Sequence, residues 1–515
     1  HRDLHSFPTR RSSDLLPGMN LLPDERTRRV FEIVLASLPA PMPVYLVGGA
    51  VRDRLLGLPV NDLDFVVPSN SLQLARTLRR KLGAAGFTLD DERQTARLIL
   101  EQGQPSELIL DFVSFTGSSL FEDLSNRDFT INTLAVALDQ PDVLIDLLGG
   151  ERDLRERRLR AASARSMELD PLRVLRGVRL SLAYHLSIEP ETLGWMRNSV
   201  RSLERVSGER VRDEIFKILE HEDLGRAFQQ MDALELTDQV FPELRAVKQV
   251  PAYPPHVHDL WTHTLQVGFY LNLLRDYFQS GELPESNRFL REACEALSPY
   301  TQSLRERLAG PVQGGRSRWS LLLLAALYHD TGKPAAQTVD AGGRIRFSGH
   351  DRISADLIAA RAQALMLGRA EVEYLKMLAA NHMRLHFFSK EGAQMTDRAC
   401  YRYFRDLGAT GVDVLLLSLA DMLAAYENTL EPAKWQRELG AAQALLDAWF
   451  SRKQQVVEPR LLLDGDDLQR EFGLEPGVLI GEILTQLREA QASGLVYNKT
   501  EALHFVEDYL GNLQR

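Results

Sequence analysis

The order of apolar and polar positions in the first part of the chain predicts short strands and helices. Residues 44–47 are an apolar run that ends at Gly48 and Gly49, and residues 50–56 have the character of a helix start. A helical period follows at 71–82, and two strand patterns follow at 96–100 and 107–115. We expect an α+β protein, with a small mixed α/β domain followed by an almost entirely helical remainder.

The length of the chain, 515 residues, exceeds what one hydrophobic core supports and predicts three or four domains. Its shares of hydrophobic residues (44%) and charged residues (26%) are typical of a water-soluble globular protein. The longest apolar run, Leu321 to Leu327, is much shorter than the ~18 residues that span a bilayer, so no membrane segment is predicted. Cys294 and Cys400 supply neither a disulfide framework nor a metal-binding pair, which favours a cytoplasmic location.

The formal net charge of −10 argues against indiscriminate nucleic-acid binding, but the charge is unevenly distributed. Between residues 151 and 180, nine arginines accompany five acidic residues. Two interpretations of this basic segment stay open. It is either an exposed helix face with ion pairs along it or a surface that contacts a phosphate backbone.

Two short patterns near residue 50 carry the first candidate chemistry. Gly48 and Gly49 allow a tight bend and leave backbone N–H groups open to an anion, as a phosphate-binding turn requires. Asp62 and Asp64 lie two residues apart in a strand-like segment, so their carboxylates point to the same face. Asp111, inside an apolar strand pattern, is a candidate third carboxylate, with a structural role as the alternative. Together these parts predict a two-metal phosphoryl-transfer site.

Five motifs in this order, between residue 44 and about residue 219, resemble the class II tRNA nucleotidyltransferase and bacterial poly(A) polymerase superfamily. The glycine turn and the aspartate pair are followed by EDLSNRDFTINTLA at 122–135, DPLRVLRGVRLS at 170–181 and SGERVRDEIFKIL at 207–219. The resemblance implies that Asp62 and Asp64 bind two Mg²⁺. It also implies nucleotide contacts from the glycine turn and from Arg52, Arg127, Asp128 and Asn132. The sequence departs from the family pattern at Asn126, Thr133 and Leu169.

The segment that begins at Asp170 predicts how a base is chosen. Asp170 is a good N-cap and Pro171 a good first helical residue, so Arg173 emerges beside the Asp170 carboxylate. Cytosine and adenine present an amine donor next to a ring-nitrogen acceptor, whereas guanine and uracil present a carbonyl next to an N–H. A carboxylate accepts from the amine and a guanidinium donates to the ring nitrogen, so this pair can select C or A without a template. An N-cap acid with an intrahelical partner is the alternative.

Two further arginines of the same segment, Arg176 and Arg179, join the predicted nucleotide-binding residues. In the next motif, the resemblance implies that Glu209 and Arg210 brace the base-reading helix.

The resemblance implies an enzyme that adds C, C and A to the 3′ end of tRNA from CTP and ATP. Only about ten residues separate the Asp111 strand from the motif at Glu122, where CCA-adding members of the family usually carry a longer flexible loop. A short connection is characteristic of enzymes that add only C and C, so this alternative stays open. A poly(A) polymerase and a phosphohydrolase with an inactive head are further alternatives.

A second constellation, in the pattern H…HD…D, predicts a metal site in the later part of the chain. Its members, with two more histidines in the expected order, are His263, His329, Asp330, His350, His382 and Asp421. They resemble an HD-type phosphohydrolase domain, which would hold one or two divalent transition metal ions of unknown identity. The implied substrates are 2′,3′-cyclic or terminal phosphates. Lys333 is either a phosphate contact or an exposed turn residue.

These motifs divide the chain into predicted parts. They are a non-native N-terminal segment (1–18), a nucleotidyltransferase head (19–150), a helical neck (151–225), an HD domain (250–430) and a helical tRNA-binding tail (431–515). The tail resembles the C-terminal segment of bacterial CCA-adding enzymes, with a dimerisation module as the alternative. The predicted partners are tRNA, CTP and ATP, and the sequence leaves the oligomeric state open.

Overall fold

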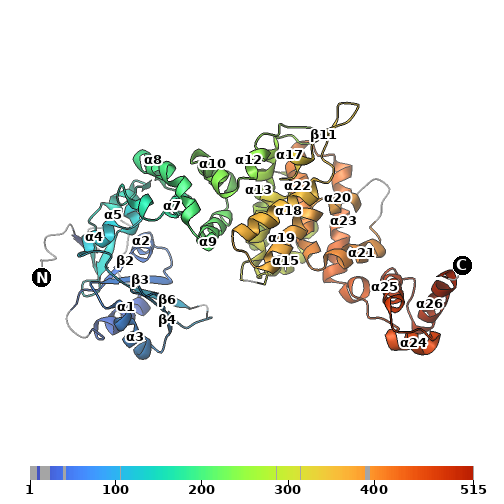
Figure 1. The fold of residues 1–515 in the computed structure, drawn as a ribbon, viewed down its shortest axis with the longest axis horizontal. Helices are drawn as coiled ribbons and strands as arrows, with labels where there is room; N and C mark the ends of the chain where they lie inside the picture. The colour runs from blue at the N-terminus through green and yellow to red at the C-terminus, as the bar shows by residue number, and fades with distance from the viewer. Residues whose placement is uncertain are drawn as a thin grey trace. The chain divides into compact units, whose positions relative to one another are not determined.

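The computed structural model describes residues 9–11, 24–38, 42–104, 106–285, 287–313, 315–388 and 395–513. Contacts divide the chain into two compact units, one of residues 1–214 and 230–239, the other of residues 215–229 and 240–515. The first unit holds a large sheet and the second is almost entirely helical (Figure 1). The predicted α+β class is therefore confirmed.

An eight-stranded sheet forms the centre of the first unit, in the order β1-β8-β7-β2-β3-β6-β5-β4. β3 and β6 are parallel, and the other neighbouring pairs in the described sheet are antiparallel. The strands are β1 (Thr9–Arg11), β2 (Tyr45–Val47), β3 (Asp62–Val67), β4 (Ala85–Asp90), β5 (Thr95–Leu100), β6 (Leu108–Ser114), β7 (Ala135–Ala137) and β8 (Val143–Ile145). The strands predicted at 96–100 and 107–115 thus appear as β5 and β6. Within the segment predicted to be non-native, 9–11 pair with β8, and its other residues lie outside the described ones.

Helices cover both faces of the sheet and continue into the arginine-rich segment. They are α1 (Glu25–Leu35), α2 (Gly49–Leu55), α3 (Ser71–Leu82), α4 (Leu120–Ser125), α5 (Gly150–Arg155), α6 (Ser166–Leu169), α7 (Arg173–Ala183), α8 (Pro190–Ser199) and α9 (Gly208–Leu219). The helices predicted at 50–56 and 71–82 are present as α2 and α3. The strand β9 (Arg158–Leu159), which follows α5, pairs in parallel with β10 (Ser187–Ile188), which precedes α8.

The helix predicted to begin at Pro171 begins two residues later, at Arg173. The Asp170 side chain is the reason, because its Oδ1 accepts a hydrogen bond from the backbone N–H of Leu172 at 3.2 Å. This bond holds a turn between α6 and α7, and the carboxylate caps that turn instead of the helix itself.

Alternation along β3 places the aspartates on one face of the sheet. The ring of Phe65 meets that of Phe31 in α1 edge-on, with 6.1 Å between centroids, on the face that α1 and α3 cover. Val66 points the other way and joins a buried cluster with apolar residues of α4. Since successive side chains of a strand alternate, Asp62 and Asp64 lie on the Val66 face.

The second unit is a helical assembly with one small hairpin. Its helices are α10 (Leu224–Ala233) and α11 (Leu236–Val240), both shared with the first unit, and α12 (Leu244–Val247), α13 (Leu260–Ser280), α14 (Arg288–Leu297), α15 (Thr301–Ala309), α16 (Arg318–Tyr328), α17 (Lys333–Ala336), α18 (His350–Ala364), α19 (Arg369–Asn381), α20 (Arg384–Phe388), α21 (Asp397–Leu407), α22 (Thr410–Tyr426), α23 (Pro432–Phe450), α24 (Gly465–Phe472), α25 (Val478–Ala492) and α26 (Lys499–Leu513). The hairpin pairs β11 (Thr338–Val339) with β12 (Ile345–Arg346).

Two helices, α16 and α22, form the centre of this unit and are buried on nearly every side. Their almost continuous apolar sequence follows from this position, and the long run at 321–327 is core. Among the described residues, no single helix is long and apolar enough to cross a membrane. One pair, Asp397–Leu407 with Thr410–Thr429, meets the length and composition criteria together but is bent by 105°.

The C-terminal helices α24, α25 and α26 have a hydrophobic core of their own, built around Leu468, Ile483, Leu487 and Val506. The preceding helix, α23, packs instead against α14, α20 and α22. The structure therefore places α23 with the helices of the predicted 250–430 domain, although the predicted tail began at 431.

Candidate active sites

The predicted carboxylates of the first unit come together on two parallel strands. Asp64 of β3 is directly opposite Asp111 of β6, and Asp62 lies two residues before Asp64 on the same face. Burial raises the pKa of Asp64, and the nearby Asp111 and Asp62 carboxylates add to this increase while Arg127 opposes it. A divalent cation would relieve this repulsion, and carboxylate oxygens are the ligands that Mg²⁺ prefers. The three residues therefore fit the predicted Mg²⁺ site.

Asp111 also has a structural partner. Its two carboxylate oxygens accept hydrogen bonds from Nε and Nη2 of Arg97 on β5, at 2.9 and 2.7 Å. This two-point pair fixes the orientation of the Asp111 carboxylate beside Asp64. The catalytic and structural interpretations of Asp111 are thus compatible.

The glycine turn lies directly against the carboxylates. Gly48 has φ of 77°, in the left-handed region that favours glycine. A Cβ at this position would come within 3.2 Å of Arg127 Nη1 and 3.4 Å of Asp64 Oδ2. Only a residue without a side chain lets the backbone approach both groups so closely.

A cleft of about 210 Å³ opens at this point of the first unit. Its lining consists of Gly48, Gly49, Asp64, Arg127, Asp128, Asn132, Asp170, Leu172, Arg173, Arg176 and Arg210. Four arginines and the glycine turn thus surround a space next to the carboxylates. This combination of cations and backbone donors suits a polyphosphate ligand.

Asp128 organises one wall of the cleft. It is buried, forms an ion pair with Nε of Arg176 at 2.8 Å and accepts a hydrogen bond from Nδ2 of Asn132 at 3.0 Å. Burial alone would raise the pKa of Asp128, but Arg176 and these hydrogen bonds hold it below its ordinary value. Asp128 therefore remains an anion that orients Arg176.

The predicted base-reading pair lines the cleft, but both members are already engaged. Arg173 donates from Nη1 to the carbonyls of Arg127 and Ser166, both at 3.0 Å, and from Nη2 to that of Asn126 at 2.8 Å. Asp170 forms an ion pair with Arg210 at 2.6 Å. Arg210, expected only as a brace, is thus a cleft residue whose partner is the carboxylate that would read the base.

Two predicted nucleotide contacts lie elsewhere. Arg52 is buried, donates to Oδ1 of Asn132 at 2.5 Å, and has its guanidinium 4.2 Å from the ring centroid of Tyr184. Arg179 forms an ion pair with Glu214 of α9 at 2.6 Å. Their guanidinium groups hold these internal partners, and neither is among the described cleft-lining residues, which favours a bracing role for both. Direct nucleotide contact by Arg52 and Arg179 stays a prediction.

In the second unit, the structure brings all six predicted metal-binding residues into one buried cluster. His263, His329, Asp330 and Asp421 offer ligand atoms that lie within 4.8 Å of one another, and Asp330, His350 and His382 form a second such group. Asp330 belongs to both groups. Its Oδ2 lies 3.2 Å from Nε2 of His329, and its Oδ1 lies 3.2 Å from Nε2 of His350.

Three of the four predicted metal-binding histidines are held in the orientation that a metal ligand requires. Nδ1 of His329 lies 2.7 Å from the carbonyl of Ala326, and Nδ1 of His382 lies 2.7 Å from the carbonyl of Ala379. Nδ1 of His350 lies 2.8 Å from the carbonyl of Phe347. Because Nδ1 donates its proton to the carbonyl, the lone pair is on Nε2, and this atom faces Asp330. The donor set therefore fits one or two divalent transition metal ions, with Asp330 as a shared ligand.

The charges around this cluster support the same interpretation. Burial alone would lower the pKa of His329, but Asp330 and Asp421 raise it to about 10. Lys333, buried rather than exposed on its turn, forms an ion pair with Asp330 at 2.5 Å. The buried acids thus attract protons and an ammonium group to a place where a metal cation would fit.

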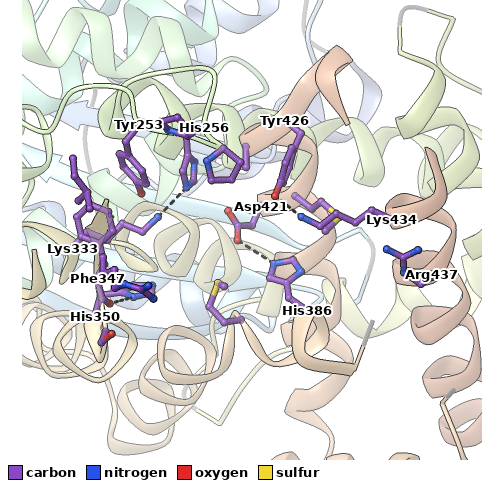
Figure 2. Close-up of a pocket in the computed structure, with 18 residues that line it drawn as sticks. Tyr253, His256, Lys333, Phe347, His350, His386, Asp421, Tyr426, Lys434 and Arg437 are labelled. Carbon is purple, nitrogen blue, oxygen red and sulfur yellow. Dashed lines mark hydrogen bonds and ion pairs between the residues drawn. The ribbon is translucent and has the colours of Figure 1, made fainter. Parts of the chain in front are cut away.

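A pocket of about 650 Å³ opens beside the cluster (Figure 2). Its floor includes Asp421 and His350, and its walls include the rings of Tyr253, Phe347 and Tyr426. Sequence reasoning missed several lining residues, because no family pattern marks them: His256, His386, Lys434 and Arg437.

Three family models match the chain. They are the poly A polymerase head domain over residues 44–160, a probable RNA- and SrmB-binding site of polymerase A over residues 185–248, and the HD domain over residues 260–426.

Whole-length relatives match as well. A CC-adding tRNA nucleotidyltransferase of Geobacter sulfurreducens is 29% identical over 486 residues, which are 92% of this chain and 96% of the relative. An A-adding tRNA nucleotidyltransferase of Deinococcus radiodurans is 31% identical over 476 residues, which are 91% and 96% of the two chains. A solved structure of a CCA-adding enzyme with CTP has a TM-score of 0.62 at 23% identity, over 98% of this chain and 99% of that one, which supports the fold.

Proposed function

The chain belongs to the tRNA nucleotidyltransferase family, and we propose that it adds C, C and A to the 3′ end of tRNA from CTP and ATP without a template. The observation that carries this proposal is the cleft in which Asp64, the Gly48 turn and the arginines meet. Its contents match what the family's reaction needs, namely metal-binding carboxylates, a triphosphate cradle and groups that can read a base.

The residues of the cleft divide the work between them. Arg127 and Arg176, with the backbone N–H groups of the glycine turn, bind and orient the triphosphate. Mg²⁺ held by the carboxylates would supply activation of the tRNA 3′-hydroxyl and neutralise charge on the leaving pyrophosphate. Asp170 and Arg173 select C or A through the shared amine and ring-nitrogen edge of these bases.

Addition of C and C alone is the second candidate, and one feature of the head favours it. Only five residues, 115–119, connect β6 to α4. This connection is held tightly, because Asp123 accepts hydrogen bonds from the N–H and the hydroxyl of Thr116, and Glu122 accepts from those of Ser118. A short connection held in this way offers little freedom to switch from CTP to ATP.

The test is extension of a tRNA that ends at the discriminator base, with labelled CTP, ATP or both. Growth by three nucleotides only when both are present supports the main proposal, and growth that stops at two supports the second. The Asp64→Asn variant should lose at least about 10³-fold in rate, since it removes a metal-binding charge. Unchanged addition by this variant would overturn the proposed site.

For the second unit, we propose a metal-dependent phosphohydrolase that acts on terminal or 2′,3′-cyclic phosphates. The six converging ligands and the adjoining pocket support this proposal. A divalent transition metal would there supply Lewis-acid activation of water and of the phosphate. Metal analysis of the purified protein tests it, because Asp330→Ala should release bound metal while leaving nucleotide addition by the first unit intact.

A further inference from the structure

The pocket of the second unit is completed by a helix that lies beyond the matched HD domain. That match ends at residue 426, whereas α23 begins at Pro432. Two α23 side chains, Lys434 and Arg437, line the pocket together with Tyr426 at the end of α22. Part of the pocket wall is therefore outside the segment that defines the domain.

A buried chain of contacts fixes α23 to the metal cluster. Glu438 of α23 is fully buried, and its Oε1 lies 2.5 Å from Nδ1 of His386. The other ring nitrogen of His386 lies 3.4 Å from Oδ2 of Asp421. Lys434 precedes Glu438 by four residues, so the two side chains project from one face of the helix. The anchor at Glu438 thus holds Lys434 at the pocket.

Three of the cations that line the pocket, Lys333, Lys434 and Arg437, lie in two places. Figure 2 shows Lys333 on the His350 side of Asp421, and Lys434 and Arg437 on the opposite side. The described partners of Lys434 are uncharged. Its ammonium donates to the hydroxyl of Tyr426 and lies 4.1 Å from the centroid of that ring. Its positive charge therefore remains available to an anion in the pocket.

The pocket also offers aromatic surfaces for a nucleoside. Tyr253 and Phe347 have ring centroids 4.7 Å apart on one wall, and Tyr426 stands on the other. The hydroxyl of Tyr253 is buried and has no hydrogen-bond partner among the described residues. Aromatic faces suit a base, and an unpaired hydroxyl suits a sugar or phosphate oxygen.

We propose that Lys434 and Arg437 form a second anion subsite, so that the pocket takes a nucleotide with phosphates at both its 3′ and 5′ positions. One phosphate would lie at the metal cluster and Lys333, and the other at Lys434 and Arg437. This inference rests on the metal site proposed above. The same chemistry occurs in a free nucleoside 3′,5′-bisphosphate and in the last nucleotide of an RNA that ends in a 3′-phosphate.

The test compares binding of adenosine 3′-monophosphate, adenosine 3′,5′-bisphosphate and a 3′-phosphorylated RNA oligonucleotide to the metal-loaded protein by titration calorimetry. Charge-assisted contacts to the second phosphate should make the bisphosphate, the RNA or both bind at least about tenfold more tightly than the monophosphate. Preference for the bisphosphate would identify a free nucleotide as the ligand, and preference for the RNA an RNA end. The Asp330→Ala variant measures the binding contributed by the first unit.

The Lys434→Gln/Arg437→Gln double variant removes both charges and keeps a polar side chain at each position. It should bring the affinity for the doubly phosphorylated ligands close to that for the monophosphate, with metal content unchanged. Lys376→Gln, a half-exposed lysine of α19, is the matched control and should change none of these values. Equal wild-type affinity for all three ligands, or an unaffected double variant, would overturn the subsite. Absence of metal from the wild-type protein would instead refute the metal site on which it depends.

Discussion

The three hydrogen bonds of Arg173 lead to a prediction that separates its structural role from its role in choosing the base. The Arg173→Lys variant keeps the positive charge but replaces two donor nitrogens by one. The guanidinium now donates to carbonyls at positions 126, 127 and 166, and one ammonium cannot reach all three with the same geometry. We therefore expect the variant to weaken the contact between the start of α7 and the segment that carries Arg127.

The expected magnitude follows from the number of bonds lost. A hydrogen bond with one charged partner contributes about 1.5–3 kcal/mol, so two lost bonds set an upper range of about 3–6 kcal/mol. Arg173 is only partly buried, and water can replace part of this loss, so we expect about 2 kcal/mol. For a unit of this size, that corresponds to a decrease of about 4–8 °C in the midpoint of thermal unfolding.

The assay pairs calorimetry with nucleotide addition. Arg93→Lys, an exposed arginine of the same unit, is the control and should leave the unfolding midpoint unchanged. We also expect kcat/KM for CTP to fall by about 10–100-fold, because the cleft loses its fixed wall. If Arg173→Lys unfolds at the wild-type temperature while addition falls, Arg173 contacts the base without bracing the cleft. If neither quantity changes, the reasoning is wrong on both counts.

Three further predictions concern charge in the two units. Arg210→Ala should shift the unfolding midpoint by little, because the half-exposed ion pair of Arg210 with Asp170 contributes about 0–1 kcal/mol. The same variant should relax the choice of base, because Asp170 loses its partner, and misincorporation of UTP measures this effect. Saturating Mn²⁺ at about 100 times its Kd should stabilise the second unit by about 2.7 kcal/mol, and Asp330→Ala should abolish this gain in calorimetry. In the metal-free protein, burial alone would lower the pKa of His386, but Asp421 and Glu438 raise it to about 9. The stability that this histidine contributes should therefore be complete below about pH 6.5 and lost as the pH rises through 9. Unfolding midpoints measured from about pH 6 to 10 check this, and the His386→Gln variant should show a flatter pH dependence.

The sequence predicted most of the head because its signals are local. A strand pattern with aspartates two residues apart places both on one face wherever the strand lies, and the structure confirms β3. Arg52 and Arg179 were assigned to the nucleotide because an arginine in a phosphate-binding motif has an obvious use. Arg179 pairs with Glu214, which is distant in sequence, whereas Arg52 pairs with its neighbour Asp53 and also contacts the distant Tyr184. No local pattern reveals which of several arginines will be paired internally.

In the second unit, too, the sequence revealed the residues that lie in motifs but not the partners that tertiary packing brings to them. The six metal-cluster residues were found because each lies in a short recognisable motif. Glu438 and Lys434 were missed because they lie in an ordinary amphipathic helix, where a glutamate and a lysine predict only a solvated surface. Tertiary packing alone buries Glu438 against His386. Such a partner becomes visible only when the helix has been placed.

The two sites differ in how their positive charges are held, and this difference has a consequence for binding. In the head, Arg176 is paired with Asp128, Arg210 with Asp170, and Arg173 with backbone carbonyls. A nucleotide must therefore exchange some of these contacts for its own, so only a base that compensates Asp170 for the loss of Arg210 is well accommodated. In the second unit, Lys434 has uncharged described partners and no such exchange is needed there. The head is thus organised for selection between ligands, whereas the contacts of Lys434 leave its charge available to an anion in the pocket of the second unit.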